Sequence, residues 1–215
     1  MERHAFALKI KEGKKNQFKA NLGKVWPGLT ALLDAHEATN FSMWNVLDMV
    51  FGYFETAGEL VYTDADKEKA AQWEAAYGDC YDWISVPFQE MRLVYEEFGV
   101  VRECKELIRH RVFITKLYPG KEEEYKSAHD ELIEARNGQI PQGPDSNFSI
   151  WCAGGYVFGY DEIDVTMDFE WTPEERQWNI DWENRMLGLM SWLTDDIDFM
   201  LDERHENIIR LGFHN

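Results

Sequence analysis

Residues 40–55 read NFSMWNVLDMVFGYFE, and residues 147–162 read NFSIWCAGGYVFGYDE. The two stretches share Asn, Phe, Ser, Trp, Val, Phe, Gly, Tyr and Glu in register, at a constant offset of 107 residues. Such self-similarity at a fixed period is the sequence signature of a repeated structural unit. The chain therefore contains two copies of one unit.

The register extends upstream of these stretches without a gap. It places Phe6 on Phe113, and Gly13-Lys14 on Gly120-Lys121. So long an ungapped register indicates a tandem duplication with a boundary near 105–109. We therefore expect one repeat at 1–106 and a second at 107–215.

The sequence of each copy predicts the same order of elements: a strand, a helix, two hairpin strands, a helix and a strand. Phe18, Leu22, Val25 and Leu29 have the spacing of a buried helix face, and the matching helix of copy two runs from about Lys121 to Arg136. The second helix of copy two begins with a capping box from Thr172 to Glu175, with a proline in its first turn. The predicted opening strands are Ala5–Lys11 and Arg111–Tyr118, and the predicted closing strands are Gly99–Cys104 and Ile208–Phe213.

The order βαββαβ is that of the ferredoxin-like split βαβ unit, whose antiparallel sheet carries its helices on one face. The other face of each sheet has to be covered, and two such sheets pressed together would bury it. The fold class predicted is therefore α+β, with two ferredoxin-like βαββαβ halves forming a pseudo-dimeric α+β barrel within one chain.

Composition excludes several classes of protein. Of 215 residues, 45% are hydrophobic, which excludes a disordered chain. The 22 Lys and Arg against 40 Asp and Glu give a net charge of −18, which argues against nucleic acid and anionic membrane surfaces as partners. No apolar stretch approaches the roughly 18 residues of a membrane helix. Three widely spaced cysteines without a CxxC motif favour reduced thiols in a cytoplasmic protein and no metal site.

The motifs of copy one resemble those of the L-rhamnose mutarotases. They are RHAFALKIKEGK at 3–14, VWPGL at 25–29, NFSMW at 40–44 and FGYFE at 51–55. Members of that family are small α+β proteins that usually pair as homodimers and interconvert the α and β anomers of a sugar, without a cofactor. Because the resemblance spans both copies, it implies that the family's dimer is fused into one chain. Whether the fused pair forms further homo-oligomers is left open.

The resemblance implies a catalytic helix that carries a tyrosine and, four residues later, a histidine acting as general acid. In copy two these are Tyr125 and His129, whereas copy one has Phe18 and Leu22 at the same positions. Copy two is therefore expected to hold the active site, and copy one a degenerate site.

The resemblance also implies substrate-binding residues. The family's second-strand tyrosine is Phe148 here, with Phe41 in copy one, and a family tryptophan survives as Trp192, with Trp83 in copy one. Trp151 is a further candidate for stacking on a sugar. The asparagine of each NFS motif recurs in both copies, which favours a role in capping the backbone over contact with a substrate.

Mutarotation needs groups that move protons near neutrality, and the ordinary pKa of histidine, about 6.5, suits this role. Tyr125 and His129 lie four residues apart and so share a helix face, which in copy one is apolar. A hydrogen-bonded core histidine is the ordinary alternative, but two polar substitutions on one inward face indicate a cavity. The same comparison suggests that Phe18 and Leu22 fill the pocket of copy one.

Three functions remain open at this stage. The first is an aldose mutarotase acting on a neutral sugar, with a 6-deoxyhexose such as L-rhamnose or L-fucose as substrate. The second is another cofactor-free enzyme on the same barrel, either a monooxygenase or a lyase, because one fold hosts many chemistries. The third is a non-catalytic sugar-binding pseudoenzyme.

Overall fold

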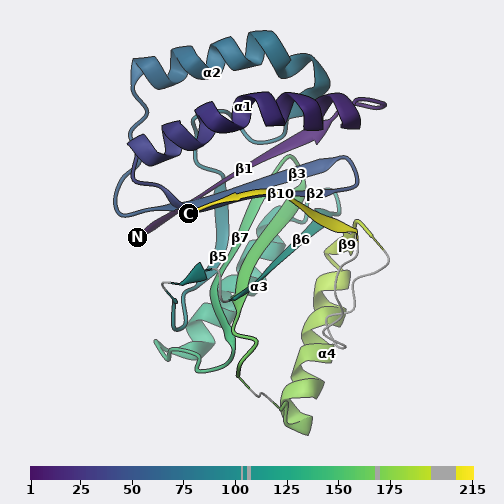
Figure 1. Ribbon diagram of the computed structural model, residues 1–215. Helices are drawn as coiled ribbons and strands as arrows, with labels where there is room; N and C mark the ends of the chain where they lie inside the picture. The colour runs from purple at the N-terminus through teal and green to yellow at the C-terminus, as the bar shows by residue number, and fades with distance from the viewer. Residues whose placement is uncertain (103, 106–107, 168–169, 195–206) are drawn as a thin grey trace. The chain divides into compact units, whose positions relative to one another are not determined.

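The computed structural model describes residues 1–102, 104–105, 108–167, 170–194 and 207–215 (Figure 1). Two compact units make up the chain. Unit 1 comprises Met1–Met91 with Ile208–Asn215, and unit 2 comprises Arg92–Asn207. The expected boundary between the sequence copies falls partly on residues outside the described ranges, so the division at 106/107 stays a prediction.

Unit 1 is a five-stranded antiparallel sheet with two long helices. Its strand order is β10-β2-β3-β1-β4. Its elements are β1 (Glu2–Ile10), α1 (Lys15–Ala35), β2 (Thr39–Val46), β3 (Met49–Thr56), α2 (Asp64–Tyr77), the short 3₁₀-helix η1 (Gly78–Cys80), β4 (Tyr81–Trp83) and β10 (Ile208–His214).

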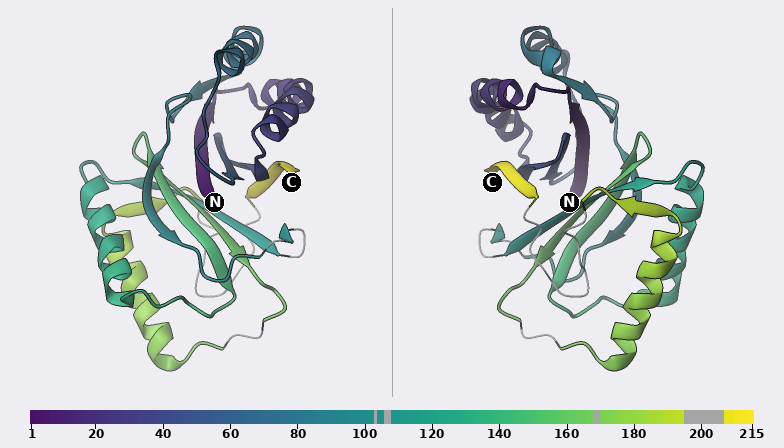
Figure 2. Two further views of the ribbon diagram at one scale, coloured as in Figure 1. Left: turned by 90° about the vertical axis from the view of Figure 1, so that its left-hand side faces the viewer. Right: turned by 90° about the vertical axis from the view of Figure 1, so that its right-hand side faces the viewer.

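Unit 2 repeats this topology, with the strand order β5-β7-β8-β6-β9. In Figure 2, its helices α3 and α4 lie on one face of its sheet. Its elements are β5 (Arg92–Glu97), β6 (Arg109–Leu117), α3 (Glu122–Arg136), β7 (Asp145–Ala153), β8 (Tyr156–Ile163), α4 (Pro173–Leu187) and β9 (Met190–Trp192). The two similar halves confirm the α+β fold class. The short strands β4 and β9 are additional to the expected βαββαβ order, and the face-to-face packing of the two sheets stays a prediction.

The last strand of each sequence copy belongs to the sheet of the other copy. β5 is the last strand of copy one but pairs with β7 of unit 2, and β10 is the last strand of copy two but pairs with β2 of unit 1. Tyr95 lies opposite Ile150, and Gly212 lies opposite Met43. Because Met43 and Ile150 are related by the repeat, Tyr95 and Gly212 occupy equivalent positions.

The expected closing strand Gly99–Cys104 is wrong. The structure places the strand at Arg92–Glu97, and the described residues of 99–104 form no strand. The segment between the last two strands is longer in copy two, at 193–207, than in copy one, at 84–91. The offset that relates the two copies therefore changes at this segment. A strand predicted for copy one by applying the earlier offset to β10 falls too far along the chain.

The helix starts follow from capping. Thr172 begins α4 as predicted: its hydroxyl accepts the Glu175 backbone N–H, and the Glu175 carboxylate accepts the Thr172 N–H at 2.8 Å. Thr63 and Asp66 make the same reciprocal pair at the start of α2. A capping box of this kind satisfies two backbone donors that the helix itself leaves unpaired.

A cross-strand pair explains the repeated FGY motif. Phe6 lies opposite Gly52, and Phe113 lies opposite Gly159. A Cβ added at Gly52 would come within 2.1 Å of the Phe6 ring, and one at Gly159 within 2.0 Å of the Phe113 ring. Each glycine therefore provides the room for a phenylalanine ring lying across it.

The repeated asparagine has a different role from the backbone cap expected. Asn40 adopts a φ of +53° at an irregularity in β2, and its amide donates to the buried carboxylate of Glu55 at 2.9 Å. The Tyr53 hydroxyl donates to the same oxygen at 3.0 Å. The corresponding group in unit 2 comprises Asn147, Tyr160, Glu162 and Lys105. Buried charges of this kind need such partners, which explains why these residues recur.

Candidate functional site

Tyr125 and His129 lie on the buried face of α3, as the spacing predicted. Both side chains are nearly inaccessible, and His129 is 3% exposed. Tyr125 belongs to the hydrophobic core between the unit 2 sheet and its helices. The structure therefore brings the two predicted catalytic residues together, with their ring centroids 4.4 Å apart.

The hydrogen bonding of His129 fixes its chemical form. Its Nδ1 lies 2.9 Å from the backbone carbonyl oxygen of Tyr125. Because a carbonyl only accepts, Nδ1 carries the proton and donates, which leaves the lone pair on Nε2. Among the described residues, Nε2 has no hydrogen-bond partner. Nε2 is therefore the nitrogen at which a ligand could exchange a proton.

Burial lowers the pKa of His129 from 6.5 to about 4, because the charged imidazolium loses its hydration. The hydrogen bond to the Tyr125 carbonyl opposes this effect only in part. His129 is consequently neutral at pH 7 in the free protein, with a lone pair on Nε2. The general-acid role that the family resemblance implies does not fit this charge state in the free protein.

Three aromatic rings surround the imidazole. The centroid of the Trp182 ring is 5.1 Å away at an interplanar angle of 85°, and that of Tyr95 is 5.4 Å away. Tyr125 is the third ring. These rings come from α4, β5 and α3, and together they exclude water from the histidine.

Tyr95 and Trp182 are site residues that the sequence interpretation missed. Trp182 has an equivalent in Trp73 of α2, so a repeat search extended into the second helices could have found it. Tyr95 reaches the site because β5, the last strand of copy one, pairs with the sheet of unit 2. The sequence repeat does not reveal this pairing. Its hydroxyl donates to Glu97 Oε2 at 2.5 Å, and Glu97 is paired with Arg136. Burial and the Glu97 carboxylate raise the pKa of Tyr95.

Phe148 and Trp192 lie on the helix-covered side of the unit 2 sheet, where both pack against the core that contains Tyr125. The Phe148 ring is 5.4 Å from that of Tyr95, and the Trp192 ring is 5.8 Å from that of Phe113. Both residues thus belong to the same aromatic layer as the His129 cluster. Neither makes a ring contact with His129 itself.

Trp151 is not brought to His129. Side chains alternate along a strand, and its neighbours Ile150 and Cys152 are the ones in the helix-side core. Trp151 therefore faces the other side of the sheet, where it is buried and donates from Nε1 to Ser149 Oγ at 3.1 Å. This placement agrees with a structural role and does not support the predicted substrate contact.

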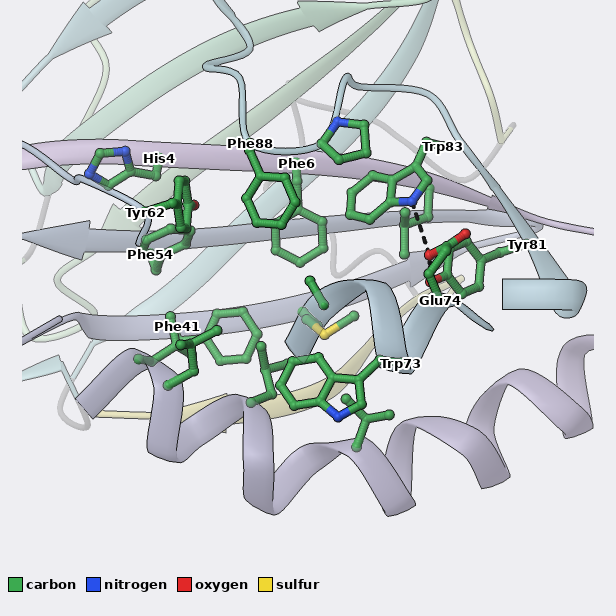
Figure 3. Close-up of a pocket in the computed structure, with 18 of the residues that line it drawn as sticks. His4, Phe6, Phe41, Phe54, Tyr62, Trp73, Glu74, Tyr81, Trp83 and Phe88 are labelled. Atoms are coloured by element: carbon green, nitrogen blue, oxygen red, sulfur yellow. Dashed lines mark hydrogen bonds between the residues drawn. The ribbon is translucent and has the colours of Figure 1, made fainter. Parts of the chain in front are cut away.

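The equivalent site of unit 1 holds an open cavity of about 370 Å³ (Figure 3). Phe18, Leu22, Phe41 and Trp83 all line it. The expectation that Phe18 and Leu22 fill this pocket is therefore wrong. Exchanging tyrosine and histidine for phenylalanine and leucine removes the polar atoms and leaves the space between the helices and the sheet open.

Unit 1 has no histidine at the position of His129. Phe18 makes an edge contact with Tyr81 at 5.9 Å, and the Trp83 indole N–H donates to Glu74 Oε2 at 3.3 Å. Within the described residues, no three His, Cys, Asp or Glu side chains cluster as metal ligands. None of the described helices is long and apolar enough to cross a membrane.

Comparison with protein families gives two matches along the chain. The family described as L-rhamnose mutarotase matches residues 3–96 and again residues 110–207. The L-rhamnose mutarotase of Listeria monocytogenes is 30% identical over 76 residues, which cover 34% of this chain and 73% of that protein.

Comparison with solved structures gives two matches that extend over most of the chain. A putative monooxygenase from Fusobacterium nucleatum is 8% identical, with a TM-score of 0.43, over 88% of this chain and 87% of that one. An anthrone oxidase-like protein is 12% identical, with a TM-score of 0.45, over 88% of this chain and 86% of that one.

Proposed function

Because the chain belongs to the L-rhamnose mutarotase family, we propose that it is a carbohydrate-acting isomerase whose second copy interconverts the α and β anomers of a neutral aldose. The observation that carries this proposal is the unpartnered Nε2 of the neutral His129, beside Tyr125, in unit 2. Unit 1, with Leu22 at that position, contributes no proton transfer.

Anomer exchange requires two proton transfers. His129 Nε2 accepts the proton of the anomeric hydroxyl while the bond between the anomeric carbon and the ring oxygen breaks and an aldehyde forms. The imidazolium then passes this proton to the ring oxygen, which completes the open-chain aldehyde and returns His129 to its neutral form. Rotation of the aldehyde and reversal of these steps close the ring on the other face. A positioned acid or base contributes about 10²–10⁴-fold to such a step.

Tyr125 is the proposed hydrogen-bond donor to the sugar. Burial raises the pKa of its hydroxyl, so the group stays protonated throughout the neutral range. It can therefore donate to the ring oxygen as negative charge develops there. We assign Phe148 and Trp192 to the apolar contact with the sugar.

The proposed substrates are 6-deoxyhexoses such as L-rhamnose and L-fucose. The phenyl ring of Phe148 offers no hydrogen-bond partner, so a hydroxyl buried against it would lose its hydration without compensation. A sugar that carries a methyl group in place of one hydroxyl avoids this loss. A neutral sugar also suits a chain whose net charge is −18.

Saturation-difference NMR on equilibrated L-rhamnose and L-fucose measures anomer exchange directly. We expect the wild-type chain to raise the exchange rate above the buffer value and His129→Leu to abolish most of this excess. Leucine is chosen because unit 1 folds with Leu22 at the equivalent position. Tyr125→Phe should retain more of the excess exchange rate than His129→Leu does. Leu22→Ala, the matched control in unit 1, should show the same exchange rate as the wild type. Exchange at the buffer rate with every aldose tested would disprove the proposal.

The enclosure of His129 by three rings also favours a second candidate, a sugar-binding protein without catalysis. The same spectra separate the two functions. A binder gives saturation transfer from protein to sugar at an unchanged exchange rate, whereas the enzyme alters the rate itself.

A further inference from the structure

The cavity of unit 1 differs from a sugar site in its chemistry. It extends between α1, α2 and the sheet, and its volume is about 370 Å³. An engineered apolar cavity of about 150 Å³ stays dry and binds benzene. The unit 1 cavity has room for a larger molecule of the same kind.

Aromatic rings from separate elements line this cavity. Figure 3 shows them gathered around one space. They are Phe6 of β1, Phe41 of β2, Phe54 of β3, Trp73 of α2, Trp83 of β4, and Tyr62 and Phe88 of the connecting segments. Flat side chains arranged in this way favour a flat, apolar ligand.

Two rings remain exposed although they line the cavity. Trp83 is 38% and Phe88 41% exposed. Phe88 has a φ of +59°, in the left-handed region that bulky residues rarely adopt, and its ring lies against Tyr62 at 5.0 Å. Backbone strain of this kind clusters at ligand clamps. The chain thus holds a phenyl ring in a strained position and leaves part of it open to solvent.

Two polar side chains that lie along the cavity are already engaged with other residues. His4 binds Glu90 through Nδ1 at 2.9 Å and Thr56 through Nε2 at 2.8 Å. Asn21 donates to Cys80. A sugar placed among the aromatic rings would bury most of its hydroxyl groups against apolar side chains, at a cost in free energy that its small apolar surface does not offset. The site therefore selects against carbohydrates.

One polar group at the rim is open to a ligand. Glu74 Oε2 accepts from the Tyr81 hydroxyl at 2.5 Å and from Trp83. Among the described residues, Oε1 of the same carboxylate has no hydrogen-bond partner. It can accept from a hydroxyl or amine, while its charge repels anions.

We propose that the unit 1 cavity binds an uncharged fused-ring aromatic molecule, with its rings among the aromatic side chains and a hydroxyl or amine donating to Glu74. The two copies then hold different ligands: unit 1 an apolar one, and unit 2 a sugar. Binding in unit 1 needs no proton transfer, which agrees with Leu22 in place of histidine.

N-Phenyl-1-naphthylamine tests this proposal, because it is an uncharged fused-ring aromatic with one N–H donor and fluoresces when it leaves water. Titration of the full chain should give saturable binding of one probe per chain. Val25 lines the cavity on α1, so Val25→Trp should weaken binding at least about tenfold. Glu74→Ala should weaken it less.

The matched control is Leu132→Trp, which places the same side chain at the equivalent position of α3 in unit 2. Probe affinity should stay within about twofold of the wild type in this variant. Equal loss in both variants, displacement of the probe by L-rhamnose, or no saturable binding by the wild type would overturn the proposal. Anomer exchange measured on Val25→Trp separates this outcome from a failure of the mutarotase assignment, because that variant leaves unit 2 unaltered.

Discussion

The indole of Trp26 lies directly over Gly212. A Cβ added at Gly212 would come within 2.2 Å of the Trp26 ring, which itself stacks on Phe41 with 5.4 Å between centroids. The tryptophan is half-buried on α1 and the glycine is on β10, so this contact attaches the C-terminal strand to the first helix of the chain. Only glycine leaves the ring room to lie there.

Unit 2 fills the equivalent space from the sheet instead of the helix. Tyr95 stands at the position of Gly212, and its ring lies 5.4 Å from Phe148. Ile133, which is 44% exposed, stands where unit 1 has Trp26. Copy two has Ile133-Glu134 where copy one has Trp26-Pro27, and in unit 2 a tyrosine of β5 takes the place of the indole beside the second-strand phenylalanine. This exchange also brings Tyr95 to His129.

Gly212→Ala should lower the free energy of unfolding by about 1–3 kcal/mol, the usual cost of overpacking. The Trp26 ring cannot move aside freely because Phe41 lies beneath it. Chemical denaturation followed by tryptophan fluorescence measures the change. In a Trp26→Leu background the same substitution should cost much less, because the ring that it meets is gone. An equal cost in both backgrounds would show that the glycine is needed for another reason.

Deletion of 208–215 should loosen the first copy of the sequence more than the second. β10 is the outer hydrogen-bonding partner of β2, so its loss exposes that edge of the unit 1 sheet. Hydrogen exchange read by mass spectrometry should show lost protection in β2. The matched strand β7 has β5 as its outer partner and should keep its protection. Loss confined to unit 2 would contradict the strand exchange.

The repeat made most of the fold predictable. The helices, the hairpins and the Thr172 cap follow from periodicity and local signals, which act over a few residues. Sheet membership of the last strands does not, because β5 and β10 satisfy the same alternating pattern in either sheet. The shift of the expected strand from Gly99–Cys104 to Arg92–Glu97 has another origin, since the longer segment before β10 changes the repeat offset and the strand pattern alone does not reveal that change.

The part of the candidate site that lies on one helix was predictable from the sequence, whereas the part contributed by distant strands was not. Tyr125 and His129 share one helix face, so their spacing was sufficient. Tyr95 reaches them through the pairing of distant strands. The cavity of unit 1 was missed for a related reason: apolar residues such as Leu22 at helical spacing have the same pattern whether they close a core or line a space.

The stability of the chain should depend on pH through His129. In the folded chain its pKa is about 4, against 6.5 when exposed. Between these values the unfolded state binds the proton and the folded state does not, so the free energy of unfolding falls as pH decreases from 6.5 to about 4. The loss is on the order of 3 kcal/mol. Above pH 6.5 this contribution is fully present.

His129→Leu should remove that part of the pH dependence. Denaturation midpoints at several pH values, compared between the variant and the wild type, isolate the contribution of this residue from that of the carboxylates. The two curves should run parallel above neutrality and diverge below pH 6.5, with the variant losing less. Parallel curves over the whole range would mean that His129 is exposed to water in solution.

The pH dependence of anomer exchange should also differ from that of an ordinary histidine enzyme. With a pKa of about 4, the proposed base His129 stays neutral as pH is lowered from 8 to 5, so the excess exchange rate should stay nearly constant. A base of pKa 6.5 would lose about tenfold or more over the same range. Exchange rates measured by saturation-difference NMR, after subtraction of the His129→Leu rate at each pH, make the comparison. Circular dichroism at pH 5 verifies that the chain is still folded. A decline centred near pH 6.5 would place the reacting group outside the buried cluster of Tyr95, Tyr125 and Trp182.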